Sequence, residues 1–268
     1  MDSVKCVSVV MATYNEPATI VEKAIRSILN QTYKDFELLI IDDSTKIETV
    51  TMINALALED KRIIVIRQNE RIGFVPALNI GLNMARGKYV SRMDGDDIAL
   101  PEKLALQINF LDSHPLVDIL GSAIFIINKD GISTSERTYP LSHSSIKLFT
   151  IFRSPFAHPT VVMRRTILDK NFRYDETLKR SEDIDLWLRL LNAGYQFANM
   201  PDKLLQYRVI GDLATKRTID HFIYNRKVRA KNFSFRNLFF SCGSLFISYI
   251  YTITPKWVVS KMYSKENF

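Results

Sequence analysis

Apolar runs and helical patterns alternate through the first half of the chain. Four short runs rich in aliphatic residues have the length of buried parallel strands, and they occupy residues 4–11, 36–41, 62–66 and 88–93. Apolar residues recur at helical spacing after each run, over residues 17–29, 49–58, 75–85 and 101–111. This alternation predicts a parallel α/β sheet with helices packed on its faces.

The pattern becomes less regular beyond residue 117. Helical spacing predicts two further helices near residues 142–152 and 181–193, and TVVM at residues 160–163 predicts a strand. Gly87 follows the third helix, where we expect it to serve as a C-cap.

Composition fits a globular protein with a full core, since 47% of the 268 residues are hydrophobic and 24% are charged. Lys and Arg outnumber Asp and Glu by 36 to 29, and the resulting net charge of +7 favours an anionic partner. Two cysteines without a CxxC pair favour a reducing compartment. The N-terminal residues lack the pattern of a signal peptide, so we expect a cytoplasmic protein.

Polar residues collect where the predicted strands end, and ligands of parallel sheets bind outside these carboxyl ends. The candidates are Thr13, Tyr14 and Glu16 after the first strand, Asp42 and Asp43 after the second, and Asp94, Asp96 and Asp97 after the fourth. The D-x-D spacing suits a hard divalent ion, which takes one or two carboxylates together with substrate phosphates. We therefore expect a Mn²⁺ or Mg²⁺ cofactor that binds a diphosphate.

Missing motifs exclude several other kinds of site. No GxG occurs for a dinucleotide fold, and no GxxxxGK[ST] occurs for a P-loop. A calcium loop that begins at Asp94 would need an oxygen ligand and a glycine where Ile98 and Ala99 stand. The four histidines are scattered without the spacing of a zinc site.

Four stretches, in this order, resemble family 2 glycosyltransferases with the GT-A fold: ATYNE, FELLIIDDS, MDGDDIALPEKL and SEDIDLWLRLL. The resemblance runs from about residue 5 to residue 210. It implies a Rossmann-like, mostly parallel central sheet flanked by helices. We place the glycosyltransferase domain at residues 1–215, with a nucleotide-binding half at 1–115 and an acceptor-binding half at 116–215, and a helical tail at 216–268.

The resemblance also implies roles for individual residues. The nucleotide-binding set is Thr13, Tyr14, Glu16, Asp42, Asp43 and Asp94, with Asp94 near the ribose. Asp96 matches the metal ligand, and Asp183 matches the catalytic base, with Glu182 before it. His158 matches a position near the junction of donor and acceptor, and we group Arg180 and Arg208 with it as basic candidates.

Sugar transfer needs a base that takes the proton of the acceptor hydroxyl. Asp183 suits this role, because we expect Ser181 to N-cap the helix and the helix dipole to favour the ionised carboxylate. One base and no covalent nucleophile predict inversion at the anomeric carbon. The QxxRW motif of processive family members is absent, so we expect transfer of one sugar or a few.

The donor implied by the resemblance is a nucleotide-sugar, most readily a UDP-sugar. The implied acceptor is a lipid-linked glycan of a bacterial surface polysaccharide such as O-antigen or capsule. Two alternatives stay open: a sugar-nucleotide nucleotidyltransferase and a non-catalytic nucleotide-sugar-binding protein. The first usually needs a Gly-rich basic loop, and ATYNEPATI contains neither Gly nor Lys or Arg. A nucleic-acid partner is not expected, because the basic excess is modest and no RNA- or DNA-binding motif occurs.

The tail combines basic and apolar residues. Residues 226–236 carry five basic residues and no acid, and residues 238–254 carry no charge. That uncharged stretch lies at the lower length limit of a membrane span. We expect a peripheral anchor on the inner face of the cell membrane, and a packed C-terminal helix is the alternative.

Overall fold

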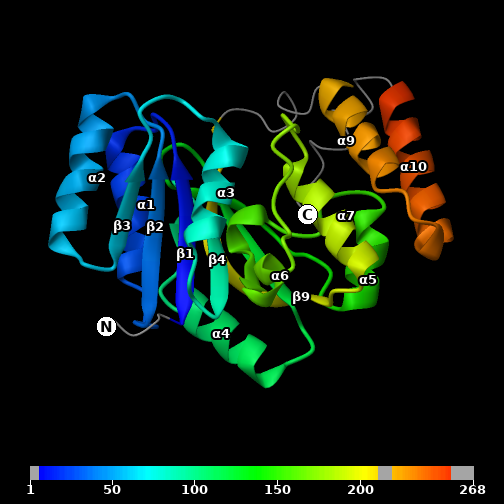
Figure 1. Ribbon diagram of the computed structural model, residues 1–268, viewed down its shortest axis with the longest axis horizontal. Helices are drawn as coiled ribbons and strands as arrows, with labels where there is room; N and C mark the ends of the chain where they lie inside the picture. Colours follow the sequence, from blue (N-terminus) through cyan, green and yellow to red (C-terminus); the bar gives the residue numbers. More distant parts are fainter. Residues whose placement is uncertain (1–5, 211–218, 255–268) are drawn as a thin grey trace.

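The computed structural model describes residues 6–210 and 219–254. The first two residues of the strand predicted at 4–11 and the predicted domain boundary at 215 and 216 lie outside the described residues. Within the described part, nine strands form one sheet in the order β3-β2-β1-β4-β8-β6-β9-β5, with β7 paired to β6. The expected α/β class, with a central sheet flanked by helices, is confirmed (Figure 1).

The first half of the sheet is parallel, as predicted. Its strands are β1 (Val7–Thr13), β2 (Phe36–Asp42), β3 (Ile63–Arg67) and β4 (Tyr89–Asp94). The helices that follow them are α1 (Ala18–Leu29), α2 (Ile47–Glu59), α3 (Phe74–Met84) and α4 (Lys103–Ser113). Each element covers most of the stretch that its hydrophobic pattern predicts.

Alternation along β1 fills the core on both faces of the sheet. Val9 and Met11 pack in one cluster with α1, α2 and α4, whereas Val10 and Ala12 pack in another with α3. Gly87 has a different role from the predicted one. Helix α3 ends at Met84, and a Cβ at Gly87 would lie 2.6 Å from the backbone N of a β1 residue, so this position has no room for a side chain.

The second half contains strands that the sequence pattern did not predict. They are β5 (Ile98–Ala99), β6 (Ile119–Ile127), β7 (Ser133–Arg137) and β9 (Phe197–Arg208). The strand predicted at residues 160–163 is β8 (Val162–Arg164), and a short 3-10 turn, η1 (His158–Thr160), precedes it. β9 escaped prediction because its centre, MPDK, carries Pro and charge.

Helices cover this half too. α5 (His143–Thr150) and α7 (Glu182–Ala193) confirm the two predicted helices, and a short α6 (Thr166–Asp169) follows β8. α7 packs on the same core cluster as α3 through Trp187, which is fully buried. β8 pairs with both β4 and β6 and so joins the second half to the first, and β5 pairs with Leu205 and Gln206 of β9.

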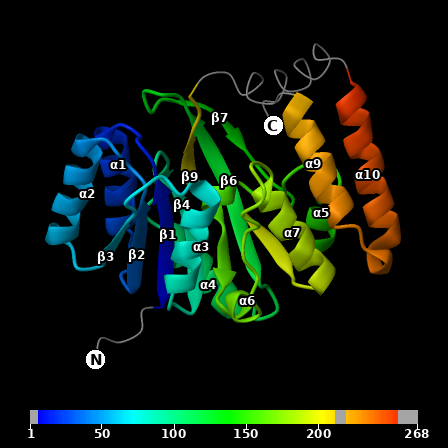
Figure 2. The same ribbon diagram turned by 45° about the horizontal axis from the view of Figure 1, so that its top comes forward.

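The tail is helical, as expected. α9 (Ile219–Lys231) and α10 (Leu238–Ile253) are joined by a 3-10 turn, η2 (Phe235–Asn237). The two helices lie side by side at the end of the molecule opposite α2, and α9 contacts α7 through Val228 (Figures 1 and 2). Among the described residues, no helix has both the length and the apolar character that a membrane crossing would require.

Candidate active site

The ends of β1, β2 and β4 meet at one edge of the sheet. Thr13 of β1 is in register with Asp42 of β2, and Ala12 is in register with Asp94 of β4. The three polar stretches expected at this edge are therefore adjacent, as parallel pairing requires.

The loop after β1 is shaped by Glu16. One carboxylate oxygen of Glu16 accepts hydrogen bonds from the Thr13 hydroxyl (2.7 Å) and from the backbone N–H of Tyr14 (2.8 Å). Asn15 has φ of 58° and ties this loop to the one after β2, because its side-chain oxygen accepts from the backbone N–H of Thr45. Thr13 is buried, and the half-exposed ring of Tyr14 lies under the Arg71 guanidinium at 4.1 Å.

The two aspartates after β2 have different environments. Asp42 is buried, pairs with Arg67 and accepts from the backbone N–H of Ser44. Asp43 accepts from the backbone N–H of Gly73 (2.8 Å) through Oδ2. Its other oxygen, Oδ1, is buried and has no partner among the described residues. A buried acceptor of this kind suits an N–H donor of a bound ligand, such as a nucleotide base.

The acidic loop after β4 consists of Asp94, Asp96 and Asp97, and one carboxylate oxygen from each lies within 4.8 Å of the others. The pKa of Asp96 is raised to about 6 by its burial and by the negative charges of Asp94 and Glu16. Crowded carboxylates that share one side of a loop suit a hard divalent cation, which would relieve their repulsion. The residues present therefore fit a Mn²⁺ or Mg²⁺ ion, with Asp96 as the expected ligand.

Arg208 holds the acidic loop in place from the end of β9. Its backbone N–H donates to Asp97 Oδ1 (2.7 Å), and its guanidinium Nε donates to the backbone oxygen of Asp96 (2.8 Å). Its Nη1 donates to the backbone oxygens of Asn128 and Lys129. These bonds tie the end of β9 to the acidic loop, and a place for Arg208 at the junction of donor and acceptor stays a prediction.

Arg92 is a site residue that sequence analysis missed. It lies in β4, is 6% exposed, and pairs with Asp94 through Nη2. Its Nε and Nη1 are buried without a partner among the described residues, and its side chain lines the large cavity. An arginine inside the KYVSRM stretch was the available signal, because strands buried on both faces rarely carry arginine.

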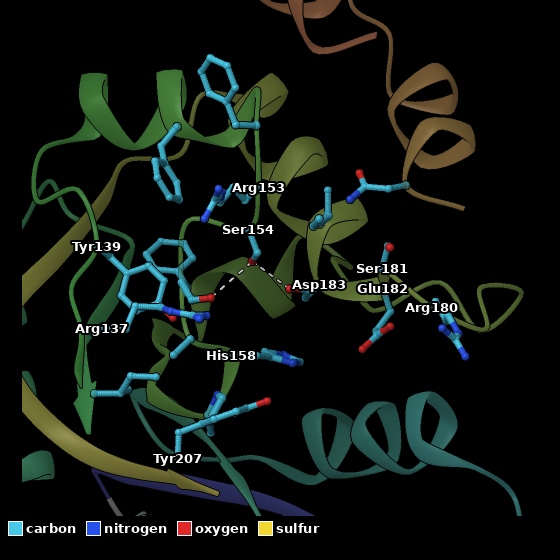
Figure 3. Close-up of a pocket in the computed structure, with 18 of the residues that line it drawn as sticks. Arg137, Tyr139, Arg153, Ser154, His158, Arg180, Ser181, Glu182, Asp183 and Tyr207 are labelled. Carbon is cyan, nitrogen blue, oxygen red and sulfur yellow. Dashed lines mark hydrogen bonds between the residues drawn. The ribbon is translucent and has the colours of Figure 1, made fainter. Parts of the chain in front are cut away.

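A cavity of about 1050 Å³ joins this edge to the start of α7. Glu182 and Asp183 line it, and the Ser154 hydroxyl donates to Asp183 Oδ2 at 2.9 Å (Figure 3). Burial and the neighbouring charge of Asp183 raise the pKa of Glu182 to about 7. Asp94 and Asp183 therefore face one space, although they are far apart in the sequence.

Ser181 is at the N-cap position of α7, but its side chain does not cap the helix. Its backbone is left-handed (φ 61°, ψ 26°), no side-chain capping bond forms, and its buried Oγ has no partner among the described residues. A serine hydroxyl usually reaches the first-turn N–H groups from an extended backbone, so the expected capping bond was wrong.

His158 and Arg180 both line the cavity. His158 Nε2 contacts the Tyr174 hydroxyl at 2.6 Å, and burial lowers the pKa of His158 well below its usual range, so the imidazole is neutral. Arg180 is exposed at the rim. Asp185 of the same motif points elsewhere, because it is fully buried and pairs with Arg189 at 2.7 Å.

Comparison with known proteins decides the family. The model of "Glycosyl transferase family 2" matches residues 8–172. The chain belongs to this family. The family 2 chain is 37% identical to an uncharacterized glycosyltransferase of Methanocaldococcus jannaschii over 76% of its own length and 70% of the relative's. It is therefore a glycosyltransferase, as expected, which argues against the nucleotidyltransferase and non-catalytic alternatives.

Two further relatives have more specific names. The amylovoran biosynthesis glycosyltransferase AmsE of Erwinia amylovora is 32% identical, over 78% of this chain and 79% of the relative. An Escherichia coli enzyme, the UDP-Glc:alpha-D-GlcNAc-diphosphoundecaprenol beta-1,3-glucosyltransferase WfaP, is 31% identical over 76% of this chain and 77% of the relative.

Solved structures agree on the fold. S. aureus TarS 1-349 superposes with a TM-score of 0.71 at 19% identity, over 92% of this chain and 72% of that one. The chain spans 39% of the longer TarS chain. The mannosyltransferase PcManGT from Pyrobaculum calidifontis, in complex with GDP-Man and Mn²⁺, gives a TM-score of 0.65 at 16% identity, over 98% of this chain and 74% of that one.

Proposed function

We propose that this family 2 glycosyltransferase transfers a sugar from a UDP-sugar to a hydroxyl of a lipid-linked glycan acceptor. The reaction is metal-dependent, inverting and non-processive. The observation that carries the proposal is the single cavity that contains both Asp94 of the acidic loop and Asp183 at the start of α7.

The nucleotide lies across the ends of β1 and β2 in this proposal. Asp43 Oδ1, a buried acceptor without a partner among the described residues, receives the N–H of the base. Thr13 and Tyr14 flank the base, and Asp94 binds the ribose. Asp96 would hold Mn²⁺ or Mg²⁺, which supplies a Lewis acid for the leaving diphosphate when bound. Arg92, which pairs with Asp94, adds a positive charge that would stabilise the same leaving diphosphate.

Asp183 takes the proton of the acceptor hydroxyl. Ser154 holds Asp183 Oδ2, which leaves Oδ1 for the incoming hydroxyl. The hydroxyl oxygen attacks the anomeric carbon, the bond from that carbon to the diphosphate breaks, and the configuration inverts in one displacement. Glu182 stays protonated over part of the neutral range because its pKa is about 7, which lessens the negative charge beside Asp183.

The named relatives support the substrate class. The printed name of WfaP gives UDP-Glc as donor and a diphosphoundecaprenol-linked GlcNAc as acceptor, and AmsE is named for the biosynthesis of amylovoran. A similar fold, that of TarS 1-349, has been solved with UDP-GlcNAc. We infer a role in surface polysaccharide biosynthesis.

A lipid-linked acceptor requires that the enzyme reaches the membrane, and α10 supports such contact. The buried face of α10 is made of Ser241, Ser244 and Ser248, whereas Phe239 is 93% exposed and Phe246 is 65% exposed. A helix that hides its serines and exposes its rings suits the bilayer interface. Nearby basic residues would each add ~1 kcal/mol at an anionic surface. We propose peripheral association with the inner face of the cell membrane.

Release of UDP from a panel of UDP-sugars, with Mn²⁺ and with EDTA, tests the proposal. A GDP-sugar serves as the control donor. Metal-dependent UDP release that increases with a glycan acceptor is expected. Preference for the GDP-sugar would contradict the base assignment, and activity undiminished by EDTA would contradict the metal assignment.

A further inference from the structure

The cavity extends past the catalytic base towards the tail helices. Figure 3 shows Arg153 and Ser154 on one side of Asp183 and His158 and Tyr207 on the other. The residues that line it away from the donor side come from the segment after α5, from α9 and from α10, and they include Phe152, Arg153, Phe222, Asn225, Arg229 and Tyr251. The donor needs none of this space in the arrangement proposed above.

This part of the cavity is basic, because Arg153 and Arg229 both line it. The cavity as a whole is lined by four further basic residues, Arg92, Arg137, Lys179 and Arg180, and by three acids, Asp94, Glu182 and Asp183. Positive charge in a concave, partly apolar wall attracts an anionic group, and arginine is the residue best suited to phosphate oxygens.

Arg229 is the best-defined of these cations, because it is 4% exposed and three of its bonds fix its orientation. Its Nε donates to Asn225 Oδ1 (2.7 Å), and its Nη1 donates to the backbone oxygen of Thr150 (2.7 Å) and to the Ser244 hydroxyl. Its Nη2 is buried and has no partner among the described residues. A buried donor without an acceptor is costly, and an anionic oxygen supplies the strongest replacement.

Burial lowers the pKa of Arg229 to about 10, so its guanidinium stays charged at neutral pH. The negative charge of Asp183 has the opposite effect and raises the pKa of Arg229. Arg229 therefore offers a positive charge within electrostatic range of the catalytic base.

We infer that the end of the cavity formed by Arg153 and Arg229 is a binding subsite for a phosphate group of the acceptor. The inference rests on the lipid-linked acceptor of the proposed function and names how this chain recognises it. Phe152 and Phe222 add apolar wall beside the arginines, which suits the first carbons of a lipid chain. α10, which lines the cavity beside α9, exposes Phe239 on the outside of the protein. A lipid chain that leaves the cavity past these helices would therefore meet the bilayer.

Calorimetry with farnesyl diphosphate tests this subsite without knowledge of the acceptor sugar. The full chain is first saturated with UDP and Mn²⁺, so that the diphosphate probe cannot occupy the donor site. Farnesol and inorganic diphosphate are the companion probes. We expect farnesyl diphosphate to bind, and Arg153→Gln and Arg229→Gln to weaken it by about 10- to 100-fold, as expected for the loss of a charge-assisted hydrogen bond.

Arg86→Gln is the matched control, because Arg86 is exposed and does not line the cavity; it should leave probe binding unchanged. Arg229→Gln could loosen α9 from α10, so Arg229→Lys, which keeps the charge, should recover part of the affinity, and Arg153→Gln tests the subsite independently. Inorganic diphosphate that binds with the same arginine dependence supports recognition through phosphate alone.

Equal binding of farnesol and farnesyl diphosphate overturns the subsite, as does farnesyl diphosphate binding that neither arginine affects. Failure of the proposed function looks different. In that case the wild-type chain binds neither UDP nor a UDP-sugar, whatever the arginine variants do with the lipid probe.

Discussion

The substitution Glu182→Gln tests the electrostatics of the site directly. It should change how the free energy of unfolding depends on pH. The pKa of Glu182 rises from 4.5 to about 7 on folding, because the carboxyl is buried beside Asp183. The folded chain thus binds more protons than the unfolded chain between these two values, so the free energy of unfolding decreases as pH rises through this window. The pKa difference corresponds to roughly 3 kcal/mol, at ~1.4 kcal/mol for each pH unit.

Glutamine is neutral at every pH and so avoids this loss. The variant should match the wild type within about 1 kcal/mol near pH 4.5 and gain stability relative to it as pH rises, with a difference that approaches ~3 kcal/mol at pH 8. Partial exposure of Glu182 makes that figure an upper value. Urea unfolding in EDTA at several pH values measures the difference, and EDTA keeps metal binding to the acidic loop from contributing.

Glu102→Gln is a suitable control, since Glu102 is exposed ahead of α4 and its side chain makes no capping bond. A stability difference between Glu182→Gln and wild type that stays constant from pH 4.5 to pH 8 would refute the reasoning. It would mean that Glu182 titrates alike in the folded and unfolded chains and that its carboxyl is not the buried, charge-crowded group described above.

Three further predictions test the proposed reaction and the membrane contact. Asp96→Asn should lose most metal-dependent turnover, because an amide is a poor ligand for a hard cation; turnover and Mn²⁺ affinity measure this, and normal transfer by the variant would contradict it. Asp183→Asn should bind UDP but lose ~10²–10⁴-fold in turnover. NMR of the wild-type product should show a β linkage from an α-linked donor, and retained configuration would rule out the single displacement. Phe239→Ser with Phe246→Ser should lower vesicle binding by about tenfold for each ring without unfolding the chain; flotation with anionic and neutral vesicles tests it, and unchanged binding would eliminate the anchor.

The parallel half of the sheet was predictable because local pattern and tertiary structure agree there. β2 is an apolar run, broken by Glu37, that ends in Asp42, and its partner strands are similarly apolar. Burial on both faces imposes such runs, and the turn residues that follow them define the strand ends. The sequence also predicts which side chains lie at that edge, since parallel strands place their carboxyl ends together.

Contacts between distant segments could not be read from the pattern. β9 bends around a bulge near residues 200–203 and was hidden by its own polar centre, so the placement of Arg208 behind the acidic loop was not predicted. Ser181 has the right residue type for a cap but the wrong backbone conformation, which the tertiary packing of α7 determines. Arg92 pairs with Asp94 and lines the cavity, contacts that the order of residues along β4 does not reveal.

Segments far apart in the sequence meet at the candidate active site. β5 follows the acidic loop and pairs with Leu205 and Gln206 of β9, and Arg208 at the end of β9 bonds to both Asp96 and Asp97. α9 rests on α7, the helix that begins with the proposed catalytic pair Glu182 and Asp183, through Val228. A ligand that orders α9 by binding Arg229 would therefore act on the same helix that presents Asp183. This coupling gives a physical reason why an acceptor phosphate, and not only the acceptor hydroxyl, should influence the rate of transfer.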